Sequence, residues 1–213
     1  MNCCARHGQD EFFSGRSAAR DARRYRRRGA DAMTRSLAKR AAARGADGAT
    51  VLEIGGGIGQ VALELVKAGA GEAVVLDLLP DYEPHVRGLA QEAGFSDRVS
   101  FRTGDLAVDP AAAGPADIVV MNKVVCCTPD GVDLAAIGAS LARRTLVVSH
   151  PRDRWWTRAA FATVNLYLRL RRRRFRVFVH PQQALEAAVE AQGLERASER
   201  EGPLFRLVAF ERI

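Results

Sequence analysis

The chain has 213 residues, of which 47% are hydrophobic, and it carries a formal net charge of +7. This length supports one substantial core and is short for two, and no apolar run is long enough to span a bilayer. The positive charge comes mostly from arginine in an alanine-rich chain, which by itself is weak support for a nucleic-acid partner. We therefore expect a single domain with small appendages.

The four cysteines occur as two adjacent pairs, Cys3–Cys4 and Cys126–Cys127. This spacing matches neither a disulfide framework nor the Cys-x-x-Cys pattern of a metal site. We therefore expect reduced thiols, a cytoplasmic location and no bound metal. A metal site that joins both pairs to His7 is the less favoured alternative, because adjacent cysteines seldom provide unstrained tetrahedral ligands.

Residues 1–46 predict a cap of two short amphipathic helices. Ser17 is suited to begin the first helix, and Met33, Leu37 and Ala41 form an apolar stripe at i, i+4 spacing on the second. We expect this cap to lie over the mouth of a binding site.

Residues 47–150 predict a cofactor-binding core in which strands and helices alternate. The apolar runs that predict strands cover 50–54, 73–77, 99–103, 117–122 and 145–150. The segments that predict helices lie near 59–68, 82–93 and 132–143. Gly69 and Gly94 follow the first two helices, where a left-handed residue is needed. The alternation predicts a parallel sheet covered on both faces.

The last third of the chain has a different pattern. Residues 153–174 are amphipathic and rich in arginine, so we expect 151–180 to form a lid beside the substrate. Residues 181–213 then predict a helix at 181–192 and two strands, 194–199 and 204–212. A short turn separates these strands, which predicts an antiparallel hairpin at the edge of the sheet.

The stretch "TVLEIGGGIGQ", residues 50–60, runs from a buried strand into four glycines. A nicotinamide-binding loop places its third glycine three residues after the second, and here that position is Gln60. The observed spacing is instead Glu-x-Gly-x-Gly-x-Gly, formed by Glu53, Gly55, Gly57 and Gly59. The loop therefore argues against a nicotinamide oxidoreductase.

This spacing resembles the first motif of the class I S-adenosylmethionine-dependent methyltransferases, and the likeness continues in motif order to His150. The resemblance implies an α/β, Rossmann-like fold with a seven-stranded sheet that is mostly parallel and ends in an antiparallel hairpin. It also implies S-adenosylmethionine as the cofactor. Glycines on alternate residues remove each Cβ that would keep the backbone away from the methionine end of this molecule.

The same resemblance assigns cofactor contacts at three successive strand ends. It places Glu53 near the methionine amino group, Asp77 on both ribose hydroxyls with Leu78 beside it, and Asp105 and the Leu106 amide on the adenine. Each carboxylate also has a structural alternative: Glu53 could accept backbone N–H groups, Asp77 could cap a helix and Asp105 could form a turn. Their common position at the carboxyl edge of the sheet favours the binding role.

Four side chains are candidates to face the acceptor: Tyr25, Asn122, Cys127 and His150. Asn122 ends the fourth strand, and it is also expected among the cofactor contacts. His150 ends the fifth strand and has a near-neutral unperturbed pKa, which suits a general base, although strand-end histidines are often structural. The Asn/Asp-Pro-Pro-aromatic motif of amide methyltransferases is missing after Asn122, which argues against nucleobase and glutamine acceptors.

A fainter resemblance involves the segment "GQDEFFSGRSAARDARRYRRRG" and the later "VVCCTPD". Both are similar to magnesium-protoporphyrin O-methyltransferases. That family carries Asp-x-Gly-Cys-Gly-Thr-Gly where this chain has "EIGGGIG", and a histidine-aromatic-proline where this chain has Cys127-Thr128-Pro129. The resemblance implies a small-molecule acceptor with a carboxylate or hydroxyl oxygen.

Three alternatives stay open at this point. An RNA methyltransferase would use the arginine runs 20–28 and 169–176 to follow phosphates, although the missing amide motif disfavours nucleic acid. Segment 153–176 could instead rest on an anionic membrane as a peripheral contact. A protein that binds S-adenosylmethionine without transferring its methyl group would keep the same loop. The sequence leaves the oligomeric state open.

Overall fold

The computed structural model describes residues 8–213, so Cys3, Cys4 and His7 lie outside the described residues. Seven strands form one sheet, and they are β1 (Thr50–Ile54), β2 (Glu72–Asp77), β3 (Val99–Thr103), β4 (Ala116–Asn122), β5 (Ala142–Pro151), β6 (Leu194–Glu201) and β7 (Phe205–Arg212). Their order is β3-β2-β1-β4-β5-β7-β6. β7 pairs antiparallel with both β5 and β6 and the other pairings are parallel, so the predicted fold and its C-terminal hairpin are confirmed.

The sheet separates two hydrophobic cores because successive residues of a strand point to opposite faces. On β4, for example, the fully buried Val120 belongs to one core and the fully buried Met121 to the other. Strands buried on both faces are typical of parallel sheets covered by helices, and their valine-rich sequences follow from this.

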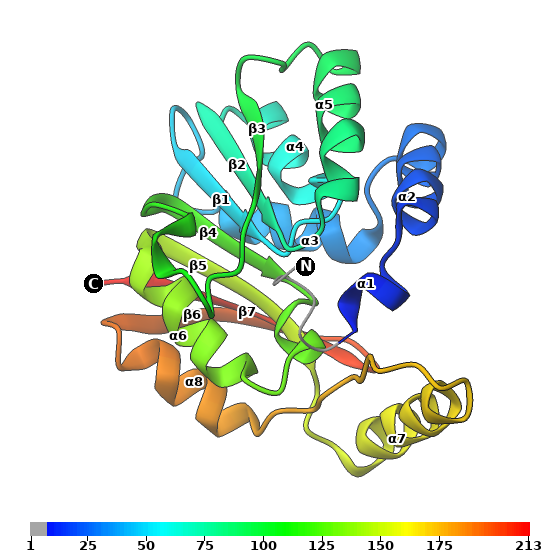
Figure 1. Ribbon diagram of the computed structural model, residues 1–213. Helices are drawn as coiled ribbons and strands as arrows, with labels where there is room; N and C mark the ends of the chain where they lie inside the picture. Colours follow the sequence, from blue (N-terminus) through cyan, green and yellow to red (C-terminus); the bar gives the residue numbers. More distant parts are fainter. Residues whose placement is uncertain (1–7) are drawn as a thin grey trace.

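Helices cover both faces of the sheet (Figure 1). On one side lie α3 (Ala32–Ala41), α4 (Gln60–Lys67) and α5 (Glu83–Glu92), and on the other lie α6 (Gly131–Leu141) and α8 (Gln182–Glu190). Single 3-10 turns follow β2 (η1, Pro80–Tyr82), β3 (η2, Pro110–Ala112) and β4 (η3, Val125–Cys127). The layered α/β arrangement brings the carboxyl ends of the parallel strands to one edge.

Three further helices stand beside that edge: α1 (Gln9–Phe12), α2 (Gly15–Arg28) and α7 (Trp155–Leu170). In Figure 1, α7 projects from the lower right of the molecule, away from the sheet. Among residues 8–213, none of the helices is both long enough and apolar enough to cross a membrane. The division into cap, core, lid and C-terminal segment stays a prediction.

The N-terminal prediction was wrong in two details. The segment forms three helices rather than two, and α2 begins at Gly15 with Ser14 at its N-cap, not at Ser17. Ser17 lies inside the helix, where its hydroxyl donates to the Ser14 carbonyl at 2.7 Å. The apolar stripe on α3 is confirmed, since Leu37 and Ala41 are buried.

The predicted helix ends are confirmed, with φ values of +108° at Gly69 and +76° at Gly94. The fifth strand begins earlier than predicted, at Ala142 instead of residue 145, because Ala142 already pairs with Ala116 of β4. β5 therefore follows α6 directly, with no loop between Leu141 and Ala142.

Candidate functional site

The glycine loop between β1 and α4 closes tightly against the segment after β4. Gly55 adopts φ +63°, and a Cβ built there would lie 2.3 Å from the Cγ2 of Val124. Gly59 adopts φ +73° and is the N-cap of α4. Residues other than glycine rarely adopt these angles, so the loop conformation depends on glycine at both positions.

Replacing Gly55 by alanine is expected to lower the affinity for the ligand of this loop by about tenfold or more, because it combines left-handed strain with the overlap at Val124. Isothermal titration calorimetry measures the loss. Gly45→Ala is the matched control, since Gly45 also has positive φ, at +90°, but nothing lies within 4 Å of an added Cβ. Equal affinities for wild type and Gly55→Ala would contradict the tight-approach argument.

The Glu53 carboxylate is buried beneath the loop and lines neither of the two cavities at this edge of the sheet. It accepts hydrogen bonds from the Ala62 amide at 2.7 Å and the Val61 amide at 3.4 Å, both in the first turn of α4. Burial raises the pKa of Glu53 to about 8, although these two hydrogen bonds oppose the shift. Glu53 therefore connects the end of β1 to the first turn of α4, and its contact with a ligand amino group stays a prediction.

Asp77 ends β2 and lies where the two adjoining cavities meet. One carboxylate oxygen accepts from the Gly57 amide at 2.8 Å and the other from the Leu79 amide at 3.1 Å. Burial raises the pKa of this carboxyl group. An ionised carboxylate has about four acceptor positions on its two oxygens, so Asp77 keeps acceptor capacity for a ligand beside its backbone partners.

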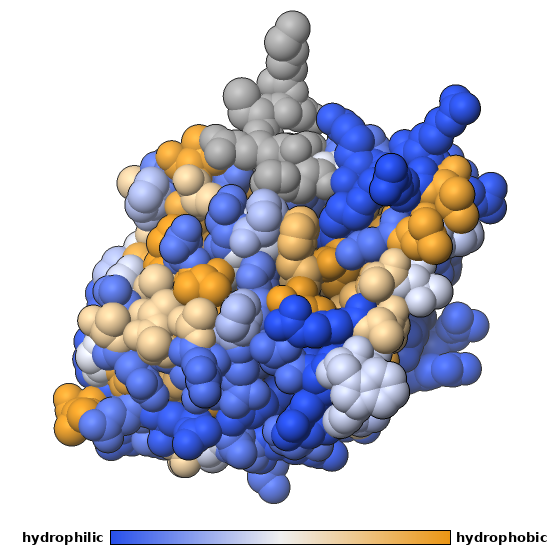
Figure 2. All heavy atoms as spheres, turned by 90° about the horizontal axis from the view of Figure 1, so that it is seen from below, coloured by the Kyte–Doolittle hydropathy of each residue, from blue (hydrophilic) through white to orange (hydrophobic). Residues whose placement is uncertain are grey.

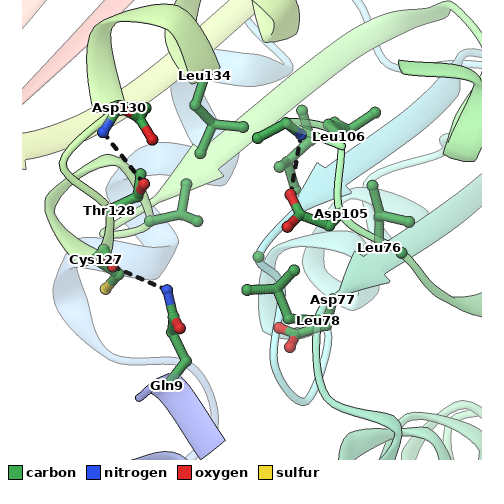
Figure 3. Close-up of a pocket in the computed structure, with 15 residues that line it drawn as sticks. Gln9, Leu76, Asp77, Leu78, Asp105, Leu106, Cys127, Thr128, Asp130 and Leu134 are labelled. Atoms are coloured by element: carbon green, nitrogen blue, oxygen red, sulfur yellow. Dashed lines mark hydrogen bonds between the residues drawn. The ribbon is translucent and has the colours of Figure 1, made fainter. Parts of the chain in front are cut away.

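The smaller cavity has a volume of about 90 Å³ and contains the predicted adenine contacts. In Figure 3, Asp77, Leu78, Asp105 and Leu106 lie on one side of it. The Asp105 carboxylate accepts from the Ala107 amide at 2.9 Å, which forms the turn that the sequence also allowed. The structure thus brings the acidic groups from the ends of β2 and β3 to one cavity.

The larger cavity has a volume of about 420 Å³, and six aromatic side chains contribute to its wall. It shares lining residues with the smaller cavity, and these are Gln9, Gly55, Asp77, Leu78, Val124 and Cys127. Its aromatic lining residues are Phe12, Phe13, Tyr82, Phe161, Phe175 and Phe205. Phe12 stacks on Phe175 with ring centroids 4.8 Å apart, so segments far apart in the sequence build one wall.

Lys123 places a positive charge in the larger cavity. It has φ +58°, and its backbone amide donates to the Ser149 hydroxyl at 2.8 Å. Its ammonium lies 3.9 Å from the Asp31 carboxylate and 5.7 Å from the centre of the Phe205 ring. Sequence reasoning missed this residue, although its position directly after Asn122, at a strand's carboxyl end, was an available signal.

Two of the four predicted acceptor-facing residues line the larger cavity. Asn122 accepts a hydrogen bond from the Ser149 hydroxyl at 2.8 Å. Cys127 lines both cavities, and its thiol has a raised pKa because of its hydrogen bond with Cys126 and its burial. Its carbonyl accepts from the Gln9 side chain at 3.2 Å, which connects α1 to the site. Among residues 8–213, no group of three His, Cys, Asp or Glu side chains could hold a metal ion.

The other two, Tyr25 and His150, line neither cavity. The Tyr25 hydroxyl donates to Glu64 at 2.7 Å, and Lys67 donates to it at 3.0 Å, so it faces α4. His150 is buried with its Nδ1 3.0 Å from the Pro151 carbonyl, and burial lowers its pKa. The structure does not bring these two side chains to the site.

Comparison with known proteins decides the family. The family model for a methyltransferase domain matches residues 22–199. This chain belongs to that methyltransferase family. No curated protein matches the sequence.

Solved structures resemble the methyltransferase over nearly its whole length. Magnesium protoporphyrin IX methyltransferase from Synechocystis PCC 6803, with bound S-adenosylhomocysteine, has 19% identity and a TM-score of 0.73 over 96% of this chain and 98% of its own. An O-methyltransferase family protein from Burkholderia thailandensis has 20% identity and a TM-score of 0.72 over 97% of this chain and 63% of its own. A putative methyltransferase in complex with the Trm112 activator from Haloferax volcanii has 18% identity and a TM-score of 0.66 over 97% of this chain and 96% of its own. At these identities the likeness shows the fold.

The methyltransferase uses S-adenosylmethionine as its cofactor, as the family and the cofactor-bound relatives indicate. Its own residues fit this molecule. The Asp77 carboxylate lies at the junction of the cavities. The loop lines both cavities at Gly55, where an added Cβ would overlap Val124. These two features suit a ribose diol and a close-lying amino-acid end.

Proposed function

We propose that this methyltransferase methylates a carboxylate or hydroxyl oxygen of a small organic acceptor held in the larger cavity. The observation that carries the proposal is the aromatic cavity of about 420 Å³ with Lys123 in its wall. Cavities of this size are typical of small-molecule sites, which combine apolar walls with a few polar groups that fix orientation. The bound cofactor supplies the methyl group, so the protein chiefly has to hold the acceptor oxygen in line with it.

Lys123 and Asp31 give this cavity the charges that an oxygen acceptor needs. The Lys123 ammonium attracts a carboxylate or phenolate, which is nucleophilic without a general base. Burial acts to raise the pKa of Asp31, but the Thr34 amide and the charge of Lys123 outweigh it, and the net shift is downward. Asp31 is therefore ionised at neutral pH, where it can accept a hydrogen bond from a hydroxyl acceptor and orient its oxygen. Asn122 and Cys127 complete the proposed acceptor wall.

The test uses cofactor labelled in its methyl group, a panel of aromatic and aliphatic carboxylates and phenols, and total RNA in a separate arm. We expect label in one or more small molecules, with an equal amount of S-adenosylhomocysteine formed. Label in RNA alone would contradict the proposal, and so would conversion of an acceptor with the methyl group left on the cofactor. A cytoplasmic location stays a prediction from the cysteine pattern.

Lys123→Met is expected to raise the KM for an anionic acceptor roughly 10- to 100-fold, the effect of losing a hydrogen bond to a charged group. The value of kcat should change far less, because the ammonium binds the acceptor before and during reaction alike. Steady-state kinetics separate the two constants. Lys39→Met is the matched control, since Lys39 is exposed on α3 and lines neither cavity. An unchanged KM in Lys123→Met would remove this residue from acceptor binding.

A further inference from the structure

Helix α7 carries an apolar stripe that faces solvent. Trp155, Ala159, Ala162, Leu166 and Leu170 follow one another at spacings of three and four residues, which places them on one face of the helix. All five are exposed, and the exposed fractions reach 77% for Trp155, 57% for Leu166 and 74% for Leu170. A stripe of this kind normally faces a core, so this helix has an unusual outer surface.

The inner face of the same helix accounts for its packing. Thr157 and Leu168 are buried, and Phe161 lines the larger cavity and contacts Phe205 edge to face at 6.2 Å. The outer stripe is therefore not needed to hold α7 in place. It is available for a partner on the side away from the cavity.

Arginines surround the stripe. Arg158 and Arg169 lie along one flank of the helix, and Arg171, Arg172 and Arg173 follow its end. Within the part of the chain that the structure describes, Arg169 and residues 171–173 form no ion pair. The nearby acids are already paired, Asp153 with Arg158, and Asp10 and Glu11 with Arg174. The surface thus has unbalanced positive charge beside exposed apolar side chains.

Figure 2 views the molecule from below the orientation of Figure 1, on the side where α7 lies. Its right-hand side shows apolar residues set among strongly hydrophilic ones. An open groove of about 600 Å³ at the end of α7 is lined by Tyr167 and residues 171–173, and it shares Phe12 with the larger cavity. The basic surface and the acceptor cavity are therefore neighbours.

We propose that the outer face of α7 and residues 171–173 dock on an anionic lipid membrane. A helix with an apolar face, flanking arginines and tryptophan lies in the membrane interface with that face among the acyl chains, and its cations contact anionic headgroups. A second copy of this chain fits less well, because it would present the same uncompensated positive charge. An RNA would pair with the arginines but leave the apolar stripe in water. The proposal does not depend on the identity of the acceptor.

Intrinsic fluorescence reports directly on this surface, because Trp155 and Trp156 are the two tryptophans of the chain. Both lie in the first turn of α7. The full-length protein is mixed with phosphatidylcholine vesicles, with or without phosphatidylglycerol, and binding is also measured by flotation. We expect a blue shift of the emission and co-flotation with the anionic vesicles only, and weaker binding at high salt.

Two pairs of variants test the apolar and the basic parts. The double variant Trp155→Glu, Leu170→Glu should no longer float with the vesicles. The control double variant Val108→Glu, Ile213→Glu should still float, because these residues are 47% and 90% exposed but lie outside α7. Replacing residues 171–173 by glutamine should lower vesicle binding about tenfold or more. The matched control replaces Arg23, Arg27 and Arg28, exposed on α2, and makes the same change in net charge. Retained S-adenosylhomocysteine binding shows that each variant is folded.

Several results would overturn the proposal. Wild-type protein that does not bind anionic vesicles would do so. An equal loss of vesicle binding in the α2 variant and in the variant of residues 171–173 would also do so. Light scattering could instead show a wild-type dimer that becomes a monomer in Trp155→Glu. Together with an absence of vesicle binding, this result would show that the stripe binds a second copy of the chain. RNA binding that persists in the glutamate variants, again without vesicle binding, would indicate that the partner is RNA and that only the arginines of this surface contact it.

Discussion

Replacing Asp77 by alanine is expected to weaken S-adenosylmethionine binding by roughly 1.5–3 kcal/mol, the range for losing hydrogen bonds to a charged group. The carboxylate lies where the two cavities meet, and it keeps acceptor capacity for a ligand beside the backbone amides that it already accepts. No other acidic side chain lines both cavities among the described residues. Calorimetric titration of the purified variant measures the difference directly.

The control for this experiment is Asp109→Ala. Asp109 also accepts a backbone amide, from Ala111 at 3.0 Å, but it is exposed and lines neither cavity. Its replacement should leave cofactor affinity unchanged. Because Asp77 also ties Gly57 and Leu79 together, Asp77→Asn provides a second variant that keeps one acceptor oxygen and the side-chain shape. A folded Asp77→Ala protein with wild-type affinity would refute the assignment to the ribose.

Glu53→Gln is expected to remove a pH dependence from the stability of the protein. Burial raises the pKa of Glu53 from 4.5 to about 8 in the folded state, so the folded state binds this proton more tightly than the unfolded chain. The free energy of unfolding therefore falls as pH rises from about 4.5 to 8, by up to about 1.4 kcal/mol per pH unit from this group. Glutamine is neutral throughout, and it keeps an acceptor oxygen for the Ala62 amide.

Urea unfolding of both proteins at a series of pH values measures this effect. The stability of Glu53→Gln relative to wild type should increase steadily across the interval, while Glu72→Gln, at an exposed residue of β2, should follow wild type. A wild-type slope retained in Glu53→Gln would show that Glu53 is ionised throughout. The first-turn amides of α4 would then stabilise its charge more strongly than burial opposes it.

The strands and the glycine loop were predictable because their signals are local. A buried parallel strand is a short apolar run, and β4 reads "ADIVVMN" for this reason. The loop was predictable because residues other than glycine rarely adopt the left-handed angles found at Gly55 and Gly59. The carboxyl ends of parallel strands share one edge, so the sequence alone was enough to place Asp77 and Asp105 near each other.

The acceptor side was harder to predict because it depends on which way side chains face. His150 was chosen for its pKa, but its neighbour Ser149 is the residue that bonds to Asn122 and the Lys123 amide. Neither Ser149 nor His150 lines a cavity, so a suitable residue type at a strand end does not show that its side chain reaches the acceptor. Tyr25 shows the same problem on a helix, since its hydroxyl faces α4.

The aromatic wall was beyond sequence reasoning for a different reason. Phe12 and Phe175 stack with ring centroids 4.8 Å apart, although 163 positions (175 − 12) separate them in the sequence. Their contact depends on how α1 and the segment after α7 pack at the sheet edge, and no local pattern encodes that. Lys123 was overlooked because a single lysine is most often a solvated surface residue, and only its place at the sheet edge distinguishes it.

The measurement that tests the two-cavity account most directly is a crystal structure of the methyltransferase with S-adenosylhomocysteine. We expect the adenine in the smaller cavity beside Leu106, the ribose hydroxyls on Asp77, and the amino-acid end along the glycine loop. The part of the larger cavity between Lys123 and the phenylalanines should then stay open for the acceptor. A nucleoside bound elsewhere, or one that fills this aromatic part, would contradict the assignment of both cavities.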